Sequence, residues 1–372
     1  MKHRVGLFVP ILIVLFLRPL FPFSHRQTES KTDAAPQKTS SFIIIPIVYY
    51  SPETRLAGGV GGLYTFRPKG TEPQDRPSAL SFVALYTQNK QFTINMKPEI
   101  YLKRETYFLT GNLEISRYPN KFFGIGNDTP DSFEESYAPH QVSLEAAVWK
   151  KIIPRHNVYA GLVYNFDHYR FEDFEPSGRL ITGDIPGSRG GTTSGLGLLL
   201  KWDDRDNVFT PRRGRQFSLS ASLYNSLFAS DYNYAKILLD LRKFFPMFGS
   251  HVLAFQGVLR TTAGNVPVMA LPKIGSDSVM RGYYSGRYRD KTMAAVQAEY
   301  RFPVWWRFGL VAFGGFGDVA KDFGHLAPSR FKFSAGWGIR FKVNPKEGAT
   351  LRLDFGYGKG VSGMYLTAGE AF

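Results

Sequence analysis

One arginine and two carboxylates carry the clearest chemistry in this sequence. Arg281 belongs to the tetrapeptide Met280-Arg281-Gly282-Tyr283, and Glu299 and Asp318 follow on the next two alternating segments. A guanidinium presents five donors in a planar fork, which carboxylates accept in bidentate fashion. We therefore expect Arg281 to bind Glu299 and Asp318, with the tyrosine packed on a wall and the glycine allowing close backbone approach. The alternative is that these are ordinary charges of a polar interior.

Two further residues are expected to support this loop-tethering site. Alternation along residues 292–303 places Arg301 on the same face as Glu299, and Phe316 shares a face with Asp318 on the following segment. A strand directs every second side chain to one side, so we expect all four side chains to point into a common interior. The predicted role is architectural and not catalytic.

Enzymatic interpretations find little support in the residues. The chain has no Cys, and its seven His are scattered without metal-ligand spacing. The segment Gly282-Tyr283-Tyr284-Ser285-Gly286 lacks the glycine two residues before serine that a nucleophile elbow requires. His168, near a strand end, is at most a weak candidate for a hydrolase pair. We expect no catalytic residue, metal, cofactor or small-molecule substrate.

The composition is typical of an all-β chain. Aromatic residues make up 15% of the sequence and Gly contributes 37 of the 372 residues. The formal net charge is +15, but the basic residues are dispersed and no recognition motif accompanies them. We therefore expect a basic surface or a basic interior and no nucleic-acid partner.

The beginning of the chain resembles an export signal. Residues 1–24 combine a charged start with an apolar run of 13 residues, Val5 to Leu17, which is too short to cross a bilayer comfortably. Residues 25–40 are polar, and we expect a disordered lead-in there. No later stretch reaches the length of a membrane helix. The exported protein is then either soluble or a β-barrel of the outer membrane.

A period of two runs through most of the remaining sequence and favours the barrel. In residues 330–343, Phe331, Phe333 and Trp337 alternate with polar residues and glycines, and residues 349–358 repeat the pattern. Segments of about ten residues with an apolar face and a charged, Gly-containing face are typical of transmembrane strands. We expect strands near 41–51, 56–66, 79–88, 91–103, 106–117, 141–152, 156–169, 192–204, 215–225, 232–245, 250–262, 292–303, 307–318, 330–343, 348–358 and 363–372.

This set of strands predicts an antiparallel transmembrane β-barrel of 16 strands over residues 41–372. Bacterial single-chain barrels have an even number of strands. Long connections such as 118–140 and 263–291 fall on one side, and short ones such as 153–155 and 246–249 fall on the other. The connection 263–291 would then be a long sixth extracellular loop, folded into the lumen. A wide barrel leaves a lumen that its own side chains do not fill, so an inward loop can occlude it.

The first and last predicted strands carry residues that weaken pairing. Pro46 removes a ladder donor from the first strand, and Gly363 and Gly369 lie in the last, which ends on Phe372. These residues predict a weak seam, although Pro46 is equally explained by an edge or a bulge.

Four motifs together resemble the BamA- and TamA-like outer-membrane assembly barrels, the bacterial surface antigen family. Met280-Arg281-Gly282-Tyr283 is similar to the family's Val-Arg-Gly-aromatic loop tip, and Glu299-Tyr300-Arg301-Phe302-Pro303 to its Glu-x-Arg-aromatic-Pro strand. Phe316-Gly317-Asp318 resembles its lumen-facing aromatic-x-Asp. The fourth motif, from Asp204 to Pro211 and Gly214, resembles the turn between its eighth and ninth strands. The terminal Phe372 resembles the β-signal of such barrels.

The resemblance implies a location in the bacterial outer membrane and a role in inserting or translocating proteins or lipids. In the family, the seam between first and last strands is thought to open and template a client strand by β-augmentation. Members usually carry periplasmic POTRA domains, and this sequence shows none ahead of residue 41. We therefore expect outer-membrane lipid around the barrel, with a separate periplasmic partner and an unfolded client polypeptide. A passive diffusion channel and a structural barrel are the alternatives.

Overall fold

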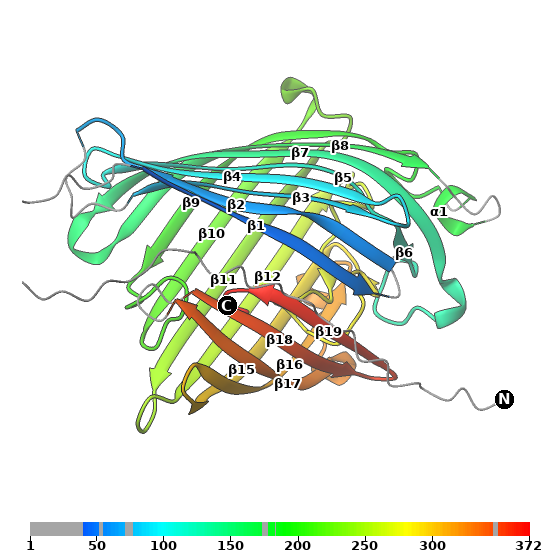
Figure 1. Ribbon diagram of the computed structural model, residues 1–372. Helices are drawn as coiled ribbons and strands as arrows, with labels where there is room; N and C mark the ends of the chain where they lie inside the picture. Colours follow the sequence, from blue (N-terminus) through cyan, green and yellow to red (C-terminus); the bar gives the residue numbers. More distant parts are fainter. Residues whose placement is uncertain (1–39, 52–54, 71–76, 173–177, 183, 345–348) are drawn as a thin grey trace, which may run out of the picture. The chain divides into compact units, whose positions relative to one another are not determined.

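The protein is all-β over the residues that its structure, a computed structural model, describes. These are residues 40–51, 55–70, 77–172, 178–182, 184–344 and 349–372. They form nineteen strands joined by turns and very short helices (Figure 1). The chain divides into two compact units, residues 1–118 and 119–372. No helix among the described residues combines the length and the apolar character needed to cross a membrane.

The first unit is a five-stranded antiparallel meander. Its strands are β1 (Ser40–Ser51), β2 (Arg55–Phe66), β3 (Ser78–Thr87), β4 (Phe92–Leu102) and β5 (Tyr107–Arg117), and each pairs with the next. Pro46 lies in mid-strand opposite Val60. Valine, isoleucine and aromatic residues favour these strands because their side chains fit a pleated surface.

The second unit is a longer antiparallel meander. Its long strands are β7 (Glu135–Ile153), β8 (Val158–Glu172), β9 (Gly191–Asp203), β10 (Gly214–Tyr224), β11 (Tyr234–Pro246), β12 (Val252–Gly264), β15 (Thr292–Trp305), β16 (Phe308–Ala320), β17 (Lys332–Asn344), β18 (Ala349–Gly358) and β19 (Val361–Ala368). Each of these strands pairs with the next one in the list. The four-residue α-helix α1 (Arg179–Thr182) lies between β8 and β9.

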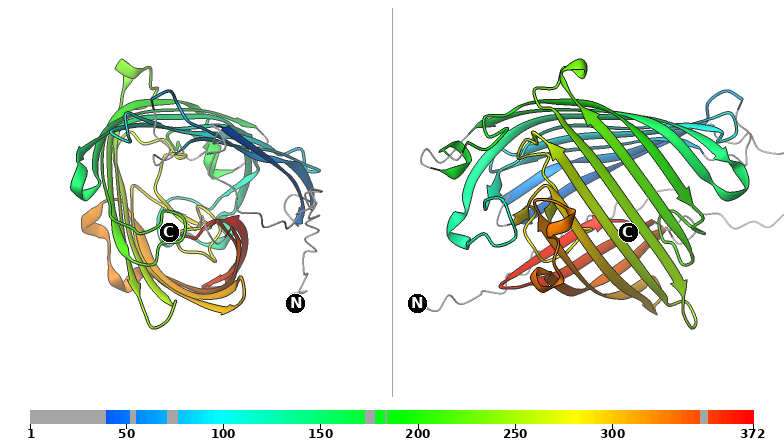
Figure 2. Two further views of the ribbon diagram at one scale, coloured as in Figure 1. Left: turned by 60° about the vertical axis from the view of Figure 1, so that its left-hand side comes forward. Right: turned by 180° about the vertical axis from the view of Figure 1, so that it is seen from behind.

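One face of this second sheet is covered by residues 265–291, which we call the covering segment. It contains the short pair β13 (Lys273–Ile274) and β14 (Tyr288–Arg289), and Figure 2 shows it in yellow against the inner side of the curved sheet. On β15 the odd-numbered residues from Met293 to Arg301 are buried, whereas Val296 is 48% exposed on the other face. The period of two in the sequence therefore separates a covered face from an outward one.

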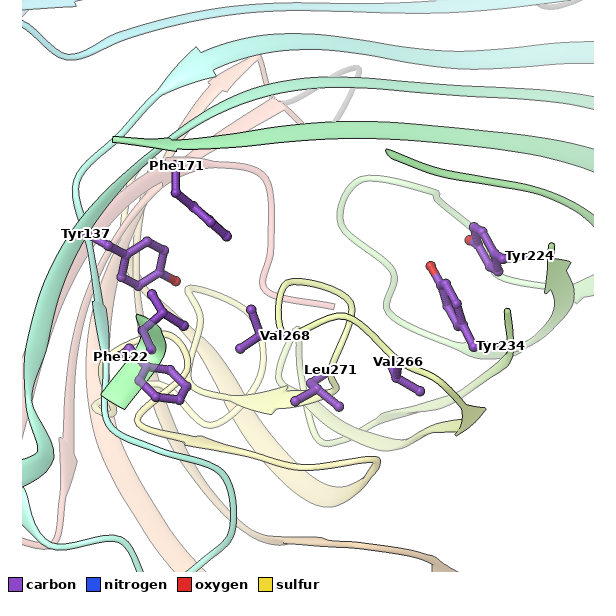
Figure 3. Packing of buried hydrophobic residues seen from close by; sticks show 9 residues of the cluster. Phe122, Tyr137, Phe171, Tyr224, Tyr234, Val266, Val268 and Leu271 are labelled. Atoms are coloured by element: carbon purple, nitrogen blue, oxygen red, sulfur yellow. The ribbon is translucent and has the colours of Figure 1, made fainter. Parts of the chain in front are cut away.

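A hydrophobic cluster anchors the first part of the covering segment. Val266, Val268 and Leu271 pack among aromatic side chains from β6 (Asn120–Phe122), β7, β8, β10 and β11 (Figure 3). Tyr224 and Tyr234, opposite each other on β10 and β11, stack with ring centroids 4.2 Å apart. Burial of this apolar surface fixes the first residues of the covering segment against the ends of the strands.

The predicted long strands match the observed ones with three differences. The predicted strand 141–152 begins six residues earlier, at Glu135, and β6, β13 and β14 were not predicted. The predicted last strand, 363–372, is wrong at its end, because β19 stops at Ala368. Gly369 has φ of +84°, a conformation outside the strand region, and it turns the following residues off the ladder. The predicted export signal 1–24 lies outside the described residues, as does the lead-in 25–40 except for Ser40, which begins β1.

Candidate functional site

The tip of the covering segment is buried against the sheet through apolar contacts. Met280 and Tyr283 have almost no exposed surface and pack with Ile274, Met293 and Val319. The Met280 amide donates to the Gln297 side chain at 3.2 Å. Met280 and Tyr283 are thus anchored on either side of Arg281, and its side chain faces the sheet.

Arg281 is fully buried and bridges two carboxylates on different strands. Its Nη2 donates to Glu299 Oε2 on β15 at 2.6 Å, and its Nη1 donates to Asp354 Oδ2 on β18 at 2.6 Å. The guanidinium also stacks over the Phe313 ring, 3.5 Å from its centroid. Charge-assisted bonds of this length are among the stronger hydrogen bonds in proteins. They connect the covering segment to two strands at once.

Neighbouring arginines complete a charge network that we call the arginine cluster. Arg301 Nε donates to Glu299 at 2.7 Å, Arg340 Nη1 donates to Asp354 at 2.5 Å, and Arg352 Nη1 donates to Asp354 at 3.1 Å. Arg352 also reaches back to the Asp277 carboxylate in the covering segment at 2.9 Å. Buried ions are tolerated only when oppositely charged groups and hydrogen bonds offset their desolvation. The network supplies these partners for both buried carboxylates.

Two glycines permit the close approach of the tip to β18. Gly282 has φ of +113°, and a Cβ there would lie 2.6 Å from the Tyr357 nitrogen. A Cβ on Gly356 would lie 2.6 Å from the Arg281 carbonyl carbon. Backbone therefore rests directly on backbone at this point. The Gly282 amide donates to the Tyr365 hydroxyl at 2.9 Å, and the Tyr283 hydroxyl donates to the Phe333 carbonyl at 2.8 Å.

The last residues of the sequence join the same network. Glu370 accepts from Arg340 Nε at 2.7 Å, and Arg301 Nη2 donates to the Phe372 carbonyl oxygen at 2.8 Å. The Phe372 side chain is 3% exposed and packs with Phe244 and neighbouring apolar residues of β12. Arg301 and Arg340 bind both the tail after β19 and the carboxylates that hold Arg281. They therefore connect the tail to the covering segment.

The expected pairing of Arg281 with Asp318 is wrong, and Asp354 takes that place. The register pairs Glu299 with Phe313, so the odd residues of β16 share the covered face and Asp318 lies on the opposite face. There the Asp318 carboxylate accepts hydrogen bonds from the Asn127 side chain and, at 3.1 Å, from the Ala327 amide. It also forms a salt bridge with Arg330 at 3.3 Å.

Phe316 also lies away from the covered face, against expectation. It is 45% exposed and stacks on Phe331 with ring centroids 5.6 Å apart. Glu299 and Arg301 lie on the covered face, where the alternation of their strand predicted them. The error at Phe316 and Asp318 came from assuming that their side of β16 was the covered one.

The predicted seam residues stand on elements other than those that hold Arg281. Gly363 is in β19 opposite Gly356, Gly369 lies beyond the strand, and Pro46 belongs to the first unit. The partners that the prediction missed are Asp354, Arg340, Arg352 and Glu370. Arg340, Arg352 and Asp354 stand on the polar faces of the alternating segments 330–343 and 349–358, so their side was predictable but their contact with the tip was not. Among the described residues, no three acidic or histidine side chains gather as a metal site would require.

Comparison with known families now identifies the fold. The Omp85 superfamily domain matches residues 76–372. The chain belongs to the Omp85 superfamily. The predicted resemblance to outer-membrane assembly barrels is confirmed, and with it the location in the bacterial outer membrane.

Solved structures show the same fold at low sequence identity. The chain is similar to BamA from Haemophilus ducreyi lacking POTRA domains 1–3, with a TM-score of 0.58 and 15% identity over 89% of this chain and 70% of that one. It is also similar to CdiB from Acinetobacter baumannii, with a TM-score of 0.53 and 13% identity over 86% of this chain and 56% of that one. No curated protein matches the sequence. At a general level, the family supports protein insertion or translocation, without enzymatic chemistry.

Proposed function

We propose that this Omp85 protein inserts or translocates polypeptides at the outer membrane, with the arginine cluster acting as a latch for the covering segment. The observation that carries the proposal is the complete burial of Arg281 between Glu299 and Asp354. A buried guanidinium that joins a connecting segment to two strands holds that segment in one position until both bonds break. Such a latch controls access and carries out no reaction.

In this proposal the five long strands of the first unit and the eleven of the second close into a sixteen-stranded barrel. The covered face is then the lumen, and the covering segment is the sixth extracellular loop. The seam lies between β1, which contains Pro46, and β19, which contains Gly363. The early end of β19 at Ala368 leaves fewer ladder bonds there, which suits pairing with the strand of a client by β-augmentation.

The proposed partners follow from this architecture. The outward face, with exposed residues such as Leu198 and Phe333, meets outer-membrane lipid. An unfolded polypeptide is the client. A separate periplasmic protein is proposed to deliver it.

Gene deletion followed by quantification of the outer-membrane proteome tests this function. We expect the loss of several barrel proteins or of one specific cargo, restored by the wild-type gene and not by an Arg281→Ala gene expressed at the same level. An unchanged proteome in the deletion strain would reject the proposal. It would favour the passive channel or the structural barrel.

A further inference from the structure

Two cationic side chains lie on the covered face of β11 and β12, and two more lie in the covering segment, in the β13–β14 pair. Lys236 on β11 and Arg260 on β12 share the covered face and are diagonal neighbours, since Lys236 pairs with Thr262 and Arg260 with Leu238. Lys273 and Arg289 are directly opposite each other in the β13–β14 pair. Like charges in directly opposed positions repel and destabilise a ladder. This arrangement is therefore costly for the protein alone.

These four cations form no salt bridge with a carboxylate among the described residues. Among the described residues, no hydrogen bond or ion pair is formed by the side chains of Lys236, Arg260 or Lys273, and the buried Nε of Arg260 has no acceptor. Arg289 is 2% exposed; its hydrogen bonds go to the carbonyl oxygens of Gly286 and Lys121, at 3.4 Å each, and its guanidinium lies over the Phe122 ring. Glu299 and Asp354 in the arginine cluster, by contrast, each accept two or more charged hydrogen bonds.

The carboxylates nearest to these cations do not neutralise them. Asp240 faces Arg260 but is already held by both Arg242, at 2.7 Å, and Gln256. Asp167 and the exposed Glu145 act on Lys236 only at longer range, and Asp167 is hydrogen-bonded by Tyr169 at 3.2 Å. The local balance therefore stays positive.

The chemistry of Lys273 agrees with this picture. Burial, reinforced by the charges of Arg289 and Arg260, lowers the pKa of Lys273 to about 8. Arg260 therefore lies close enough to act on a lysine of the covering segment. Lys236, Arg260 and Lys273 are partly exposed and not fully buried.

We infer that Lys236, Arg260, Lys273 and Arg289 form a binding site for a phosphate-class oxyanion, free or carried on a lipid headgroup. Arg260 offers a guanidinium fork for bidentate binding, and the lysines add point charges. The hydroxyl of Ser222, opposite Lys236, provides a further donor at the wall. An anion there would offset the repulsion between the wall and the covering segment and hold the two together.

Calorimetric titration of the full chain in a non-ionic detergent with inorganic phosphate tests the site. We expect saturable binding that weakens by about tenfold or more in Arg260→Gln and in Lys236→Met, since each removes a charged hydrogen bond. Lys321→Met, which removes one charge from an exposed loop, should bind as the wild type does. Retained heat-modifiable gel migration shows that each variant is folded.

Two further titrations identify the source of the anion and test the contribution of Lys273. Glycerol phosphate binding more tightly than inorganic phosphate would identify a lipid headgroup as the source, and equal affinity would identify free phosphate. Sulfate keeps a constant charge, so its affinity should fall as pH rises through about 8 and should lose this dependence in Lys273→Met. No saturable binding, or equal binding by wild type and a folded Arg260→Gln, would overturn the inference.

Discussion

Arg281 is held by two carboxylates from which solvent is excluded, so its removal leaves two buried charges without their shared partner. We predict that Arg281→Ala lowers the stability of the covering segment by about 3–5 kcal/mol, the cost typical of breaking a buried ion pair. Limited proteolysis of the purified protein should then cleave within residues 265–291 much faster than in the wild type. Arg281→Lys should rescue little, because one ammonium group does not reach both Glu299 and Asp354 in the geometry of a fork.

The choice of carboxylate gives a sharper form of the same prediction. Asp354→Asn should expose the covering segment to protease, as Arg281→Ala does, since Asp354 accepts from Arg281, Arg340 and Arg352. Asp318→Asn is the matched control, because its side chain leaves β16 on the other face and does not bind Arg281. Faster cleavage in Asp318→Asn together with wild-type protection in Asp354→Asn would contradict the assignment.

Gly356 carries a steric prediction. A methyl group there would meet the backbone of Arg281 at 2.6 Å, a distance that backbone atoms relieve only by moving apart. We expect Gly356→Ala to lower the free energy of unfolding by about 1–3 kcal/mol through overpacking. Gly257→Ala is the control, since nothing lies within 4 Å of its added carbon. Thermal unfolding of both variants measures the difference, and equal melting temperatures would show that the tip does not rest on β18.

At the scale of the element, the β13–β14 pair is sensitive to pH. The pKa of Lys273 is lowered to about 8 by burial and by neighbouring arginines, below its ordinary 10.5. The unfolded segment therefore binds more protons than the folded one between these values, and stability must rise with pH across that window. Protease protection of the covering segment, measured in anion-free buffer, should increase from pH about 8 to about 10. Lys273→Met should flatten this profile, and a flat wild-type profile would show that Lys273 is not desolvated.

The tail after β19 is a second element with a measurable role. Phe372 packs into a buried apolar cluster with Phe244 and Val252, and its carbonyl binds Arg301. Phe372→Ala should cost about 3–5 kcal/mol, as large-to-small changes of buried aromatic residues do. We expect reduced levels of folded protein in the outer membrane, measured by heat-modifiable migration. Phe323→Ala, at an exposed loop position, is the control, and equal levels in both variants would remove the tail from assembly.

The elements were more predictable than their contacts, for a physical reason. Alternation is local, so segments such as 330–343 and 349–358 indicated both a strand and its polar face. The partner of Arg281 depends on strand register and on where the covering segment lies, which no local pattern encodes. Asp318 was therefore predicted as the partner, and Asp354 was not considered. The last strand was predicted to run to Phe372 because its sequence does not show that Gly369 adopts a positive φ. That conformation ends the strand and turns the chain inward.

At the scale of the whole molecule, a latched segment and an open pore predict different electrical behaviour. If the covering segment occludes a closed barrel, the wild-type protein in a planar bilayer should show small, flickering conductance. Arg281→Ala should raise it, because the segment loses its bonds to β15 and β18 together. Asp318→Asn should leave the conductance unchanged, since that carboxylate binds outside the covered face. An ordinary diffusion channel would be insensitive to both substitutions. A large, steady wild-type conductance that Arg281→Ala does not alter would therefore reject the latch and favour a channel.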